Sequence, residues 1–333
     1  MDRSRGNDPY FDWPLDEGER GREVWYSLVT HQDGDRAFWY RYTLLSTDSG
    51  HQEGRVWAGY TDREQPERSF FTTERHPLDA VGLSTPLEYE VDGCRLTSTS
   101  ASGELDDGTR WDFEYEEDDF TFTPLRSKKL TDAAERLLGS GRHWSYNQSI
   151  SIDGELEVGD ETVEFESAPG HQGHTVGRTS PESWSWLHCN SFDEDVVVEA
   201  LEIEGKLSVC LRRDDDVHVL NRVHHVLGPT SNNSRRNEPG DWRLTAKGEG
   251  VKLDVSVDVD PSTWRKAVYL TPDESRRYVA HSSLADVSLT YRVDGSGPRT
   301  HETSGGRAEW SATSPVVGDP GDYVPAEFVE RSG

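Results

Sequence analysis

Apolar and polar residues alternate with a period of two along most of this chain, and this pattern restricts its fold more than any other feature. The segments that show it clearly are 24–30, 36–45, 111–117, 119–125, 196–205, 206–213, 216–226 and 251–259. Tight turns are indicated by Asp-Gly pairs at 33–34, 107–108, 153–154 and 294–295. Helical signals occur at 130–141, with Thr131 or Asp132 as cap, and as a short turn at 271–280. The pattern predicts an all-β protein with one or two short helices.

Two pairs of segments indicate an internal duplication. Aligning Trp111 with Trp242 matches two apparent hairpins, including return strands that begin near Phe120 and Val251. Upstream, the aromatic hairpin at 24–44 resembles the segment 183–203, and the order of the two hairpins is the same in both halves. We therefore predict two similar domains, residues 1–140 and 141–333, that meet near the helix. Each would be a barrel or curved sandwich of about eight strands, with room inside for a small ligand.

The chain is strongly acidic, because 63 Asp and Glu residues stand against 35 Lys and Arg among 333 residues, giving a formal net charge of -28 at pH 7. Lysine occurs only at Lys128, Lys129, Lys206, Lys247, Lys252 and Lys266. Hydrophobic content is only 32%, but the 11 tryptophans and the regular alternation argue against disorder. In molar salt the screening length falls to ~3 Å, so we interpret the acidity as adaptation to high salt. The charge also argues against a nucleic-acid partner.

The remaining composition gives expectations about location. Cys94, Cys189 and Cys210 are widely spaced, so we expect neither a disulfide framework nor a CxxC metal motif. The N-terminal segment lacks the apolar run of a signal peptide, and no run approaches the ~18 apolar residues of a membrane span. We expect a soluble, cytoplasmic protein without a transmembrane segment or a cofactor. The oligomeric state stays open.

Four motifs are similar to a known family. EVWYSLVTHQDGDRAFWYRYTL (23–44) and WAGYTDREQPERSFFTTER (57–75) resemble the first strands of the AttH-like, or carotenoid hydratase, family, and PESWSWLHCNSF (181–192) and ETSGGRAEW (302–310) resemble motifs of the tocopherol cyclases. The resemblance implies two tandem lipocalin-like domains and an apolar isoprenoid or lipid ligand. It also implies acid-assisted hydration or cyclisation of an alkene. His188 departs from the pattern, because the cyclases carry glutamine there.

The segment HQGHTVGRTSPESWSWLHCN (171–190) is the strongest candidate for a site. The residues that would share one face of a strand here are Trp184, Trp186, His188 and Asn190. We predict that this face lines a ligand cavity inside the second domain, with His171 and His174 on a glycine loop at its mouth. Indole faces attract a cation by ~0.5–2 kcal/mol each, which suits a carbocation. The alternative is that the tryptophans only fill the barrel.

A proton donor is needed for this chemistry, and the predicted catalytic residues are His188, Glu309 and Asp62. Both carboxylates lie in segments that the resemblance covers, and burial would raise their pKa toward neutrality. The resemblance also places Trp25, in the opening hairpin, among the ligand contacts.

A metal is not expected. The candidate ligands are His171, His174, His188, His224 and His225, the last two on a strand that can turn only one of them inward, and no acid stands beside the first pair.

Two other classes of function stay open. The same pocket could belong to a carrier that binds an isoprenoid or lipid unchanged, with transient contact to a membrane. Alternatively, tryptophans that stack on sugars and a pair of carboxylates would make a carbohydrate-binding or carbohydrate-active protein. Mass analysis of products separates enzyme from carrier, and glycan binding would favour the third class.

Overall fold

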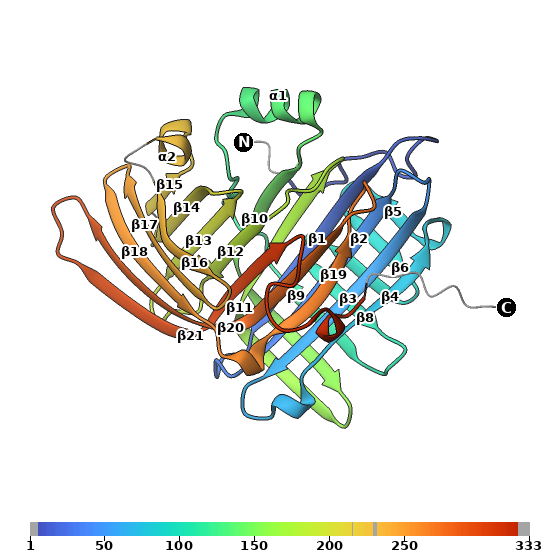
Figure 1. The fold of residues 1–333 in the computed structure, drawn as a ribbon. Coiled ribbons are helices and arrows are strands. Elements are labelled where there is room, and N and C mark those ends of the chain that lie inside the picture. The colour runs from blue at the N-terminus through green and yellow to red at the C-terminus, as the bar shows by residue number, and fades with distance from the viewer. Residues whose placement is uncertain (1–5, 215, 229–231, 326–333) are drawn as a thin grey trace.

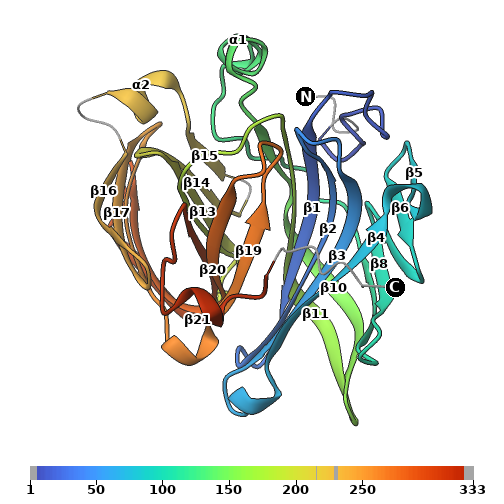
Figure 2. The ribbon, with the colours of Figure 1, turned by 45° about the vertical axis from the view of Figure 1, so that its right-hand side comes forward.

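The computed structural model of the protein describes residues 6–214, 216–228 and 232–325, and two curled β-sheets make up most of it (Figures 1 and 2). The strands of the first sheet are β1 (Gly21–Thr30), β2 (Arg36–Ser46), β3 (Gln52–Asp62), β4 (Phe70–Pro77), β5 (Gly82–Ser84), β6 (Glu88–Val91), β7 (Cys94–Thr97), β8 (Ser100–Glu104), β9 (Arg110–Tyr115), β10 (Arg142–Val158) and β11 (Glu161–Gly177).

The second sheet follows in the chain. Its strands are β12 (Trp184–Cys189), β13 (Val196–Ile203), β14 (Lys206–Arg213), β15 (Asp216–Leu220), β16 (Asn233–Glu238), β17 (Asp241–Gly248), β18 (Val251–Asp258), β19 (Arg265–Leu270), β20 (Arg276–Val293) and β21 (Arg299–Ala312). The helices of the described chain are α1 (Lys128–Leu138) and α2 (Val223–Leu227), and the 3₁₀ turns are η2 (Pro66–Arg68), η3 (Leu78–Ala80), η4 (Pro261–Thr263) and η5 (Pro320–Asp322). None of these helices has the length and apolarity needed to cross a bilayer.

The two sheets repeat one topology. The first has the order β4-β3-β2-β1-β11-β10-β9-β8-β7-β6-β5, and the second has the order β15-β14-β13-β12-β21-β20-β18-β17-β16, with β19 paired to β20. The run β1 to β4 therefore corresponds to β12 to β15, and the long hairpin β10-β11 corresponds to β20-β21. This confirms the predicted all-β class with two tandem halves and short helices.

Of the two pairs of segments that indicated a duplication, one occupies equivalent places in the two sheets and the other does not. The aromatic hairpins at 24–44 and 183–203 are β1-β2 and β12-β13, which occupy equivalent places in the two sheets. The tryptophan alignment was wrong by one strand, because Trp111 lies on β9, whose counterpart is β18, while Trp242 lies on β17. The first return strand is also absent, since Phe122 makes only an isolated bridge to Ser145.

The division of the chain between the sheets differs from the expected boundary at residue 140. The strands that follow α1, β10 and β11, pair with β9 and β1 and so complete the first sheet. The second sheet starts only at Trp184, which leaves residues 178–183 as the connection. Sequence periodicity identifies strands but not their partners, and the helix signal was therefore a poor guide to the boundary.

Three hydrophobic cores hold the structure together. One fills the curl of the first sheet and contains aromatic rings such as Trp25, Tyr40 and Trp111. A second fills the curl of the other sheet, with Leu187 and Trp242 among its members. The third lies between the outer faces of the two sheets, and includes Leu28, Trp39, Trp57, Trp186, Leu201 and Tyr269. The sheets thus meet back to back, each with its own packed interior.

Several local predictions need correction. Helix α1 agrees with the signal at 130–141 and ends at Gly139, which adopts a left-handed φ of 65°, but its N-cap is Ser127 rather than Thr131 or Asp132. The segment 216–226 is the strand β15 followed by α2, and the expected helical turn at 271–280 runs into β20. Gly154 forms no turn, because it lies inside β10 at a register shift.

Candidate functional site

Strand β12 carries the predicted site, but its tryptophan face points the other way. Leu187 and Cys189 belong to the core inside the second sheet, whereas Trp186 belongs to the core between the sheets. His188 contacts Gln148 of the first sheet, since its Nε2 lies 2.7 Å from the Gln148 carbonyl oxygen. Trp186 and His188 do share one face of β12, as predicted from the alternation. This face lines the junction of the two halves and not the interior of the second half.

A buried group of polar and aromatic side chains gathers at this junction. We call it the inter-sheet cluster, and its members are Tyr26 on β1, His143, Ser145 and Gln148 on β10, His171 on β11, Trp186 and His188 on β12, Glu199 on β13 and Arg307 on β21. The first sheet supplies the first five residues, and the second sheet supplies the other four. The cluster therefore exists only because the two halves of the chain pack together.

Glu199 is the acidic centre of the cluster and is fully buried. Its Oε1 accepts hydrogen bonds from Ser145 Oγ at 2.5 Å and from Trp186 Nε1 at 3.0 Å. Its Oε2 accepts one from Gln148 Nε2 at 2.7 Å. His143 Nε2 lies 3.8 Å from Oε1. Three neutral donors from two strands, β10 and β12, thus fix one carboxylate at the junction.

Two imidazoles lie against each other, with their planes tilted by 34°, beside this carboxylate. The ring centroids of His171 and His188 lie 4.2 Å apart, and both residues are fully buried. Arg307 Nη1 lies 3.0 Å from His188 Nδ1. A guanidinium can only donate, so this nitrogen accepts and the ring proton sits on Nε2, facing the Gln148 carbonyl. His188 is therefore a neutral imidazole.

His171 has a free nitrogen. Its Nδ1 lies 3.4 Å from the Gln148 carbonyl oxygen, which favours a proton on that atom, and its Nε2 has no hydrogen-bond partner among the described residues. A neutral His171 with this tautomer presents the Nε2 lone pair to its surroundings. A buried acceptor without a partner is costly, and it marks a place where a polar atom of a ligand or a water would be stabilised.

Arg307 ties the cluster to both sheets. Its Nη1 donates to Asn190 Oδ1 at 2.6 Å, and its Nη2 donates to Thr30 Oγ1 at 2.9 Å and to the Pro169 carbonyl at 2.5 Å. Burial lowers the pKa of Arg307 to about 10, which still leaves it cationic at neutral pH. The positive charge of Arg307 disfavours protonation of the neighbouring His188 imidazole.

The electrostatics separate the acid from the two bases. Burial lowers the pKa of His171 to about 4, and burial together with His171 and Arg307 lowers that of His188 well below its ordinary value. For Glu199, burial raises the pKa, but the nearby imidazoles of His143 and His171 and the hydrogen bond from Ser145 outweigh it, and the net shift is downward. At neutral pH the unliganded cluster holds a carboxylate and two neutral imidazoles. His188, one of the three proton donors considered from the sequence, is therefore a neutral imidazole in this structure.

Aromatic rings enclose the cluster. Tyr26 meets Trp186 edge to face at 5.8 Å between ring centroids, and Trp186 lies 5.4 Å from His171. Gly173, on β11, makes room for Tyr26, because a Cβ there would lie 2.4 Å from the phenol ring. Tyr26 is half-buried while Trp186 is buried, which puts Tyr26 at the edge of the cluster.

Two of the predicted ligand contacts face the opposite side of the first sheet. Residues 171 to 177 belong to β11 rather than to a glycine loop, so His171 and His174, three residues apart, point to opposite faces. His174 Nε2 lies 2.9 Å from Glu23 Oε1, inside the first half. Trp25 stacks on His174 at 4.8 Å and donates from Nε1 to the Asn7 carbonyl at 2.9 Å. Both are core residues, and neither belongs to the inter-sheet cluster.

Glu309 and Trp184 lie at the junction but are engaged with each other. Trp184 Nε1 donates to Glu309 Oε1 at 2.7 Å, and Glu309 Oε2 lies 3.6 Å from His281 Nδ1. Burial raises the pKa of Glu309, but His281 and the indole bond outweigh it, and the net shift is downward. Glu309 is therefore ionised at neutral pH in this structure, and not the carboxylic acid expected from the sequence.

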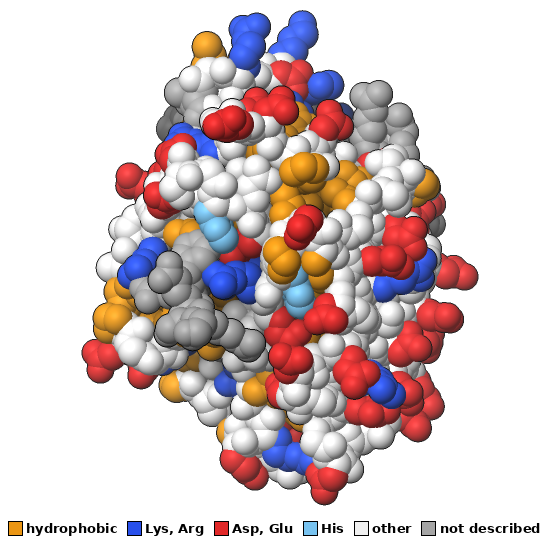
Figure 3. Space-filling model, turned by 90° about the vertical axis from the view of Figure 1, so that its right-hand side faces the viewer, with side chains coloured by type: hydrophobic (Ala, Val, Ile, Leu, Met, Phe, Trp, Pro, Cys, Tyr) orange, Lys and Arg blue, Asp and Glu red, His pale blue; other side chains and the backbone are white. Residues whose placement is uncertain are grey.

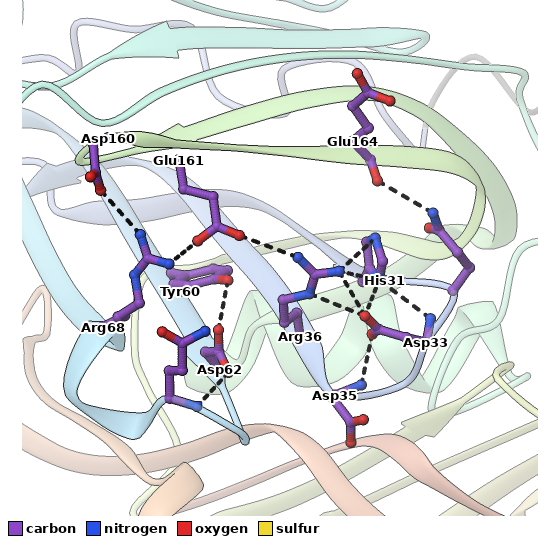
Figure 4. A network of polar contacts seen from close by, with 12 residues as sticks. His31, Asp33, Asp35, Arg36, Tyr60, Asp62, Arg68, Asp160, Glu161 and Glu164 are labelled. Carbon is purple, nitrogen blue, oxygen red and sulfur yellow. Dashed lines mark hydrogen bonds and ion pairs between the residues drawn. The ribbon is translucent and has the colours of Figure 1, made fainter.

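Asp62 has a structural explanation. Its Oδ1 accepts from the Gln65 backbone at 2.8 Å, and its Oδ2 accepts from the Tyr60 hydroxyl at 3.2 Å (Figure 4). These bonds close the turn after β3. The same region holds a network of surface ion pairs that links Arg36 and Arg68 to Glu161. No contact joins Asp62 to the inter-sheet cluster among the residues described.

Trp186 and His188, predicted to line a cavity inside the second half, face the junction of the two sheets instead. Two surface hollows, of about 490 and 580 Å³, are lined by segments around Gly240 and Trp264 and around Arg20 and Arg178. Neither includes a predicted site residue, and the curl of the first sheet is filled by aromatic side chains.

One histidine group has the composition of a metal site. His224 and His225 lie on α2 rather than on a strand, and their ligand atoms and that of Glu249 lie within 4.8 Å of one another. Arg222 Nε lies 3.3 Å from Glu249 Oε1, so the guanidinium of Arg222 already forms an ion pair with this carboxylate. These three residues lie on α2 and between β17 and β18, and none of them belongs to an element that contributes to the inter-sheet cluster.

Sequence reasoning missed Tyr26, His143, Gln148, Glu199 and Arg307. One signal was available, because Glu199 interrupts the apolar run VVVEAL in β13, and a lone acid in a buried strand needs a partner. The others come from three different strands of two sheets, and only the packing brings them together.

Comparisons with known proteins agree with this architecture. The tocopherol cyclase-like family matches residues 19–261. The crystal structure of a protein described as AttH from Nitrosomonas europaea superposes with a TM-score of 0.54 at 11% identity, covering 90% of this chain and 96% of that one. Kievitone hydratase from Nectria haematococca gives a TM-score of 0.51 at 13% identity, covering 92% and 97%.

At these identities the two structures support the double lipocalin-like fold alone. No curated protein matches the sequence at a significant level. The family match spans most of the chain, from just before β1 to η4, and so includes β12, β13 and most of the inter-sheet cluster. The chain belongs to the tocopherol cyclase-like family.

Proposed function

We propose that the protein binds an apolar isoprenoid at the inter-sheet cluster and adds water, or a hydroxyl of the same molecule, across one of its double bonds. The observation that carries this proposal is the burial of a carboxylate and two neutral imidazoles beside Tyr26 and Trp186. The family membership and the hydratase among the structural neighbours support the same class of reaction.

The acid in this proposal is Glu199. In the unliganded protein its carboxylate is stabilised by hydrogen bonds from Ser145, Gln148 and Trp186. An apolar chain inserted beside Trp186 weakens these bonds and leaves burial as the dominant influence, which raises the pKa of the carboxyl group. Glu199 then takes up a proton before the reaction and delivers it to an alkene carbon.

The remaining steps return the site to its starting state. Proton transfer leaves a tertiary carbocation, which the faces of Trp186 and Tyr26 stabilise. A water, or the internal hydroxyl in a cyclisation, attacks the cation and loses its proton to Nε2 of His171. That proton returns to Glu199. The net change is the addition of one O–H bond across one C=C bond, with no oxidant or reductant.

The test is incubation of the protein with polyprenyl alcohols and linear carotenoids, followed by mass spectrometry. Hydration gives a mass gain of one water, and cyclisation gives an isomer of equal mass. Quenching of tryptophan fluorescence is measured in parallel. Binding without product would identify a carrier, and neither binding nor product would overturn the proposal. For the alternative of a carbohydrate ligand, Trp25, Trp111 and Trp242 are fully buried and offer no stacking surface, whereas Trp264 is partly exposed and lines a surface hollow.

A further inference from the structure

Helix α1 stands out from the two sheets at the end of the molecule where α2 also lies (Figures 1 and 2). Its Leu137 is 73% exposed and its Leu130 is 48% exposed. On α2, Leu227 is 64% exposed and Val223 is 41% exposed. These four, with Tyr10 and Val217, are the exposed large hydrophobic residues of the described chain. An exposed apolar group of this kind indicates a surface that meets something else.

The charges of α1 are sorted by face. Leu130 and Leu137 are seven residues, or about two turns, apart and share one side of the helix. Lys129 and Arg136 have the same spacing and form a parallel row beside them, and both are exposed. The helix therefore presents one row of leucine next to one row of cations.

The acids of α1 face the body of the protein. Asp132 accepts from Arg142 Nη2 at 2.6 Å, and Glu135 accepts from Arg142 Nε at 2.8 Å. The Tyr10 hydroxyl donates to Glu135 at 2.5 Å. These hydrogen bonds hold the carboxylates of Asp132 and Glu135 against Arg142 and Tyr10 and so fix the orientation of α1.

The connection to α2 is also defined. The Arg126 backbone N–H donates to the Asn221 carbonyl at 3.1 Å, which joins the start of α1 to the residues before α2. We call the outer surface of α1 formed by Lys129, Leu130, Arg136 and Leu137 the docking face. Helix α2, with its exposed Val223 and Leu227, lies at the same end of the molecule.

The docking face contrasts with the rest of the molecule. The chain has a net charge of -28 and very few lysines, yet Lys128 and Lys129 are adjacent in α1. In Figure 3 Asp and Glu side chains are spread over the face; Lys and Arg side chains project at its upper end and also occur at several places lower down. Lys129 and Arg136 can pair with anionic headgroups at direct contact, whereas the carboxylates of the body cannot. A leucine row flanked by cations is the arrangement of helices that lie in the interface of a bilayer, with leucine in the acyl region and cations among the headgroups.

We propose that the docking face binds the surface of a bilayer that contains anionic lipids. This inference concerns where the protein works and does not depend on the chemistry at Glu199. An apolar isoprenoid resides in a bilayer, so such a surface would place the protein beside a source of that class of ligand.

The experiment is flotation of the whole protein with vesicles of phosphatidylcholine, with and without one quarter phosphatidylglycerol. The buffer has the lowest salt that keeps the native circular dichroism spectrum. We expect binding to the anionic vesicles. The double variants Leu130→Ser/Leu137→Ser and Lys129→Glu/Arg136→Glu should each weaken it by about tenfold or more.

The matched control reverses two exposed cations elsewhere, Arg95→Glu/Arg110→Glu on β7 and β9, and should bind like the wild type. Light scattering of each variant checks for self-association. The proposal is overturned if wild type does not float, if the control loses as much binding as the α1 variants, or if the leucine variant changes only the oligomeric state, which would assign the face to a second copy of this chain.

Discussion

Trp186 and Glu199, on the neighbouring strands β12 and β13, are joined by a hydrogen bond of 3.0 Å from the indole Nε1 to the carboxylate Oε1. Both side chains leave the outer face of the second sheet and meet Ser145 and Gln148 of the first. An acid and a cation-stabilising ring are thus held together at the junction of two domains that resemble each other.

Replacement of Glu199 by Gln should abolish turnover and leave the fold intact. The amide keeps the shape of the carboxylate but cannot donate a proton to carbon. Glu202→Gln is the matched control, because Glu202 lies on the same strand, faces away from the cluster and bonds Ser234. Product formation and the circular dichroism spectrum are measured for both. Comparable turnover in the two variants would remove Glu199 from the mechanism.

Acid should destabilise the protein through the buried imidazoles. The pKa of His171 falls from about 6.5 to about 4 on folding, so the unfolded chain binds more protons between these values. The free energy of unfolding is therefore unaffected by His171 above pH 6.5 and falls as pH drops toward 4, by a total of about 3 kcal/mol. Urea unfolding at several pH values should show a steeper acid loss in wild type than in His171→Gln. Parallel curves for the two proteins would refute this assignment.

Arg307→Met should cost about 3–5 kcal/mol, as loss of one member of a buried polar group typically does. The side chain joins Thr30 and Pro169 of the first half to His188 and Asn190 of the second. Its loss should therefore separate the unfolding of the two sheets. Differential scanning calorimetry is the measurement, and a single transition at the wild-type temperature would show that Arg307 does not couple them.

Concentrated salt should stabilise the protein. At a net charge of -28 self-repulsion is strong, and molar salt reduces the screening length to ~3 Å. Thermal unfolding is compared in dilute buffer and in molar KCl, with a neutral osmolyte as control. Equal stability in the two buffers would argue against adaptation to high salt.

The sequence allowed the fold class, both aromatic hairpins and α1 to be predicted, because these depend on local periodicity. It allowed the grouping of Trp186 with His188, since alternate residues of a strand share a face. It did not reveal which side that face meets, because β12 is apolar on both sides and both sides are buried. His171 and His174 have similar sequence surroundings, but both lie on β11. Because they are three residues apart on a strand, only the side chain of His171 faces the junction. Asp62 and Glu309 were chosen by motif, which does not show that their carboxylates accept hydrogen bonds from Gln65, Tyr60 and Trp184.

The location of the ligand tests the account most directly. A crystal structure of the protein with a saturated, unreactive polyprenyl analogue would show which of three apolar regions it occupies. We predict density between the sheets, in contact with Trp186 and Tyr26, and with Glu199 within reach of the chain. Density inside the curl of either sheet, among the residues around Tyr40 or Leu187, would contradict the assignment of the inter-sheet cluster as the site.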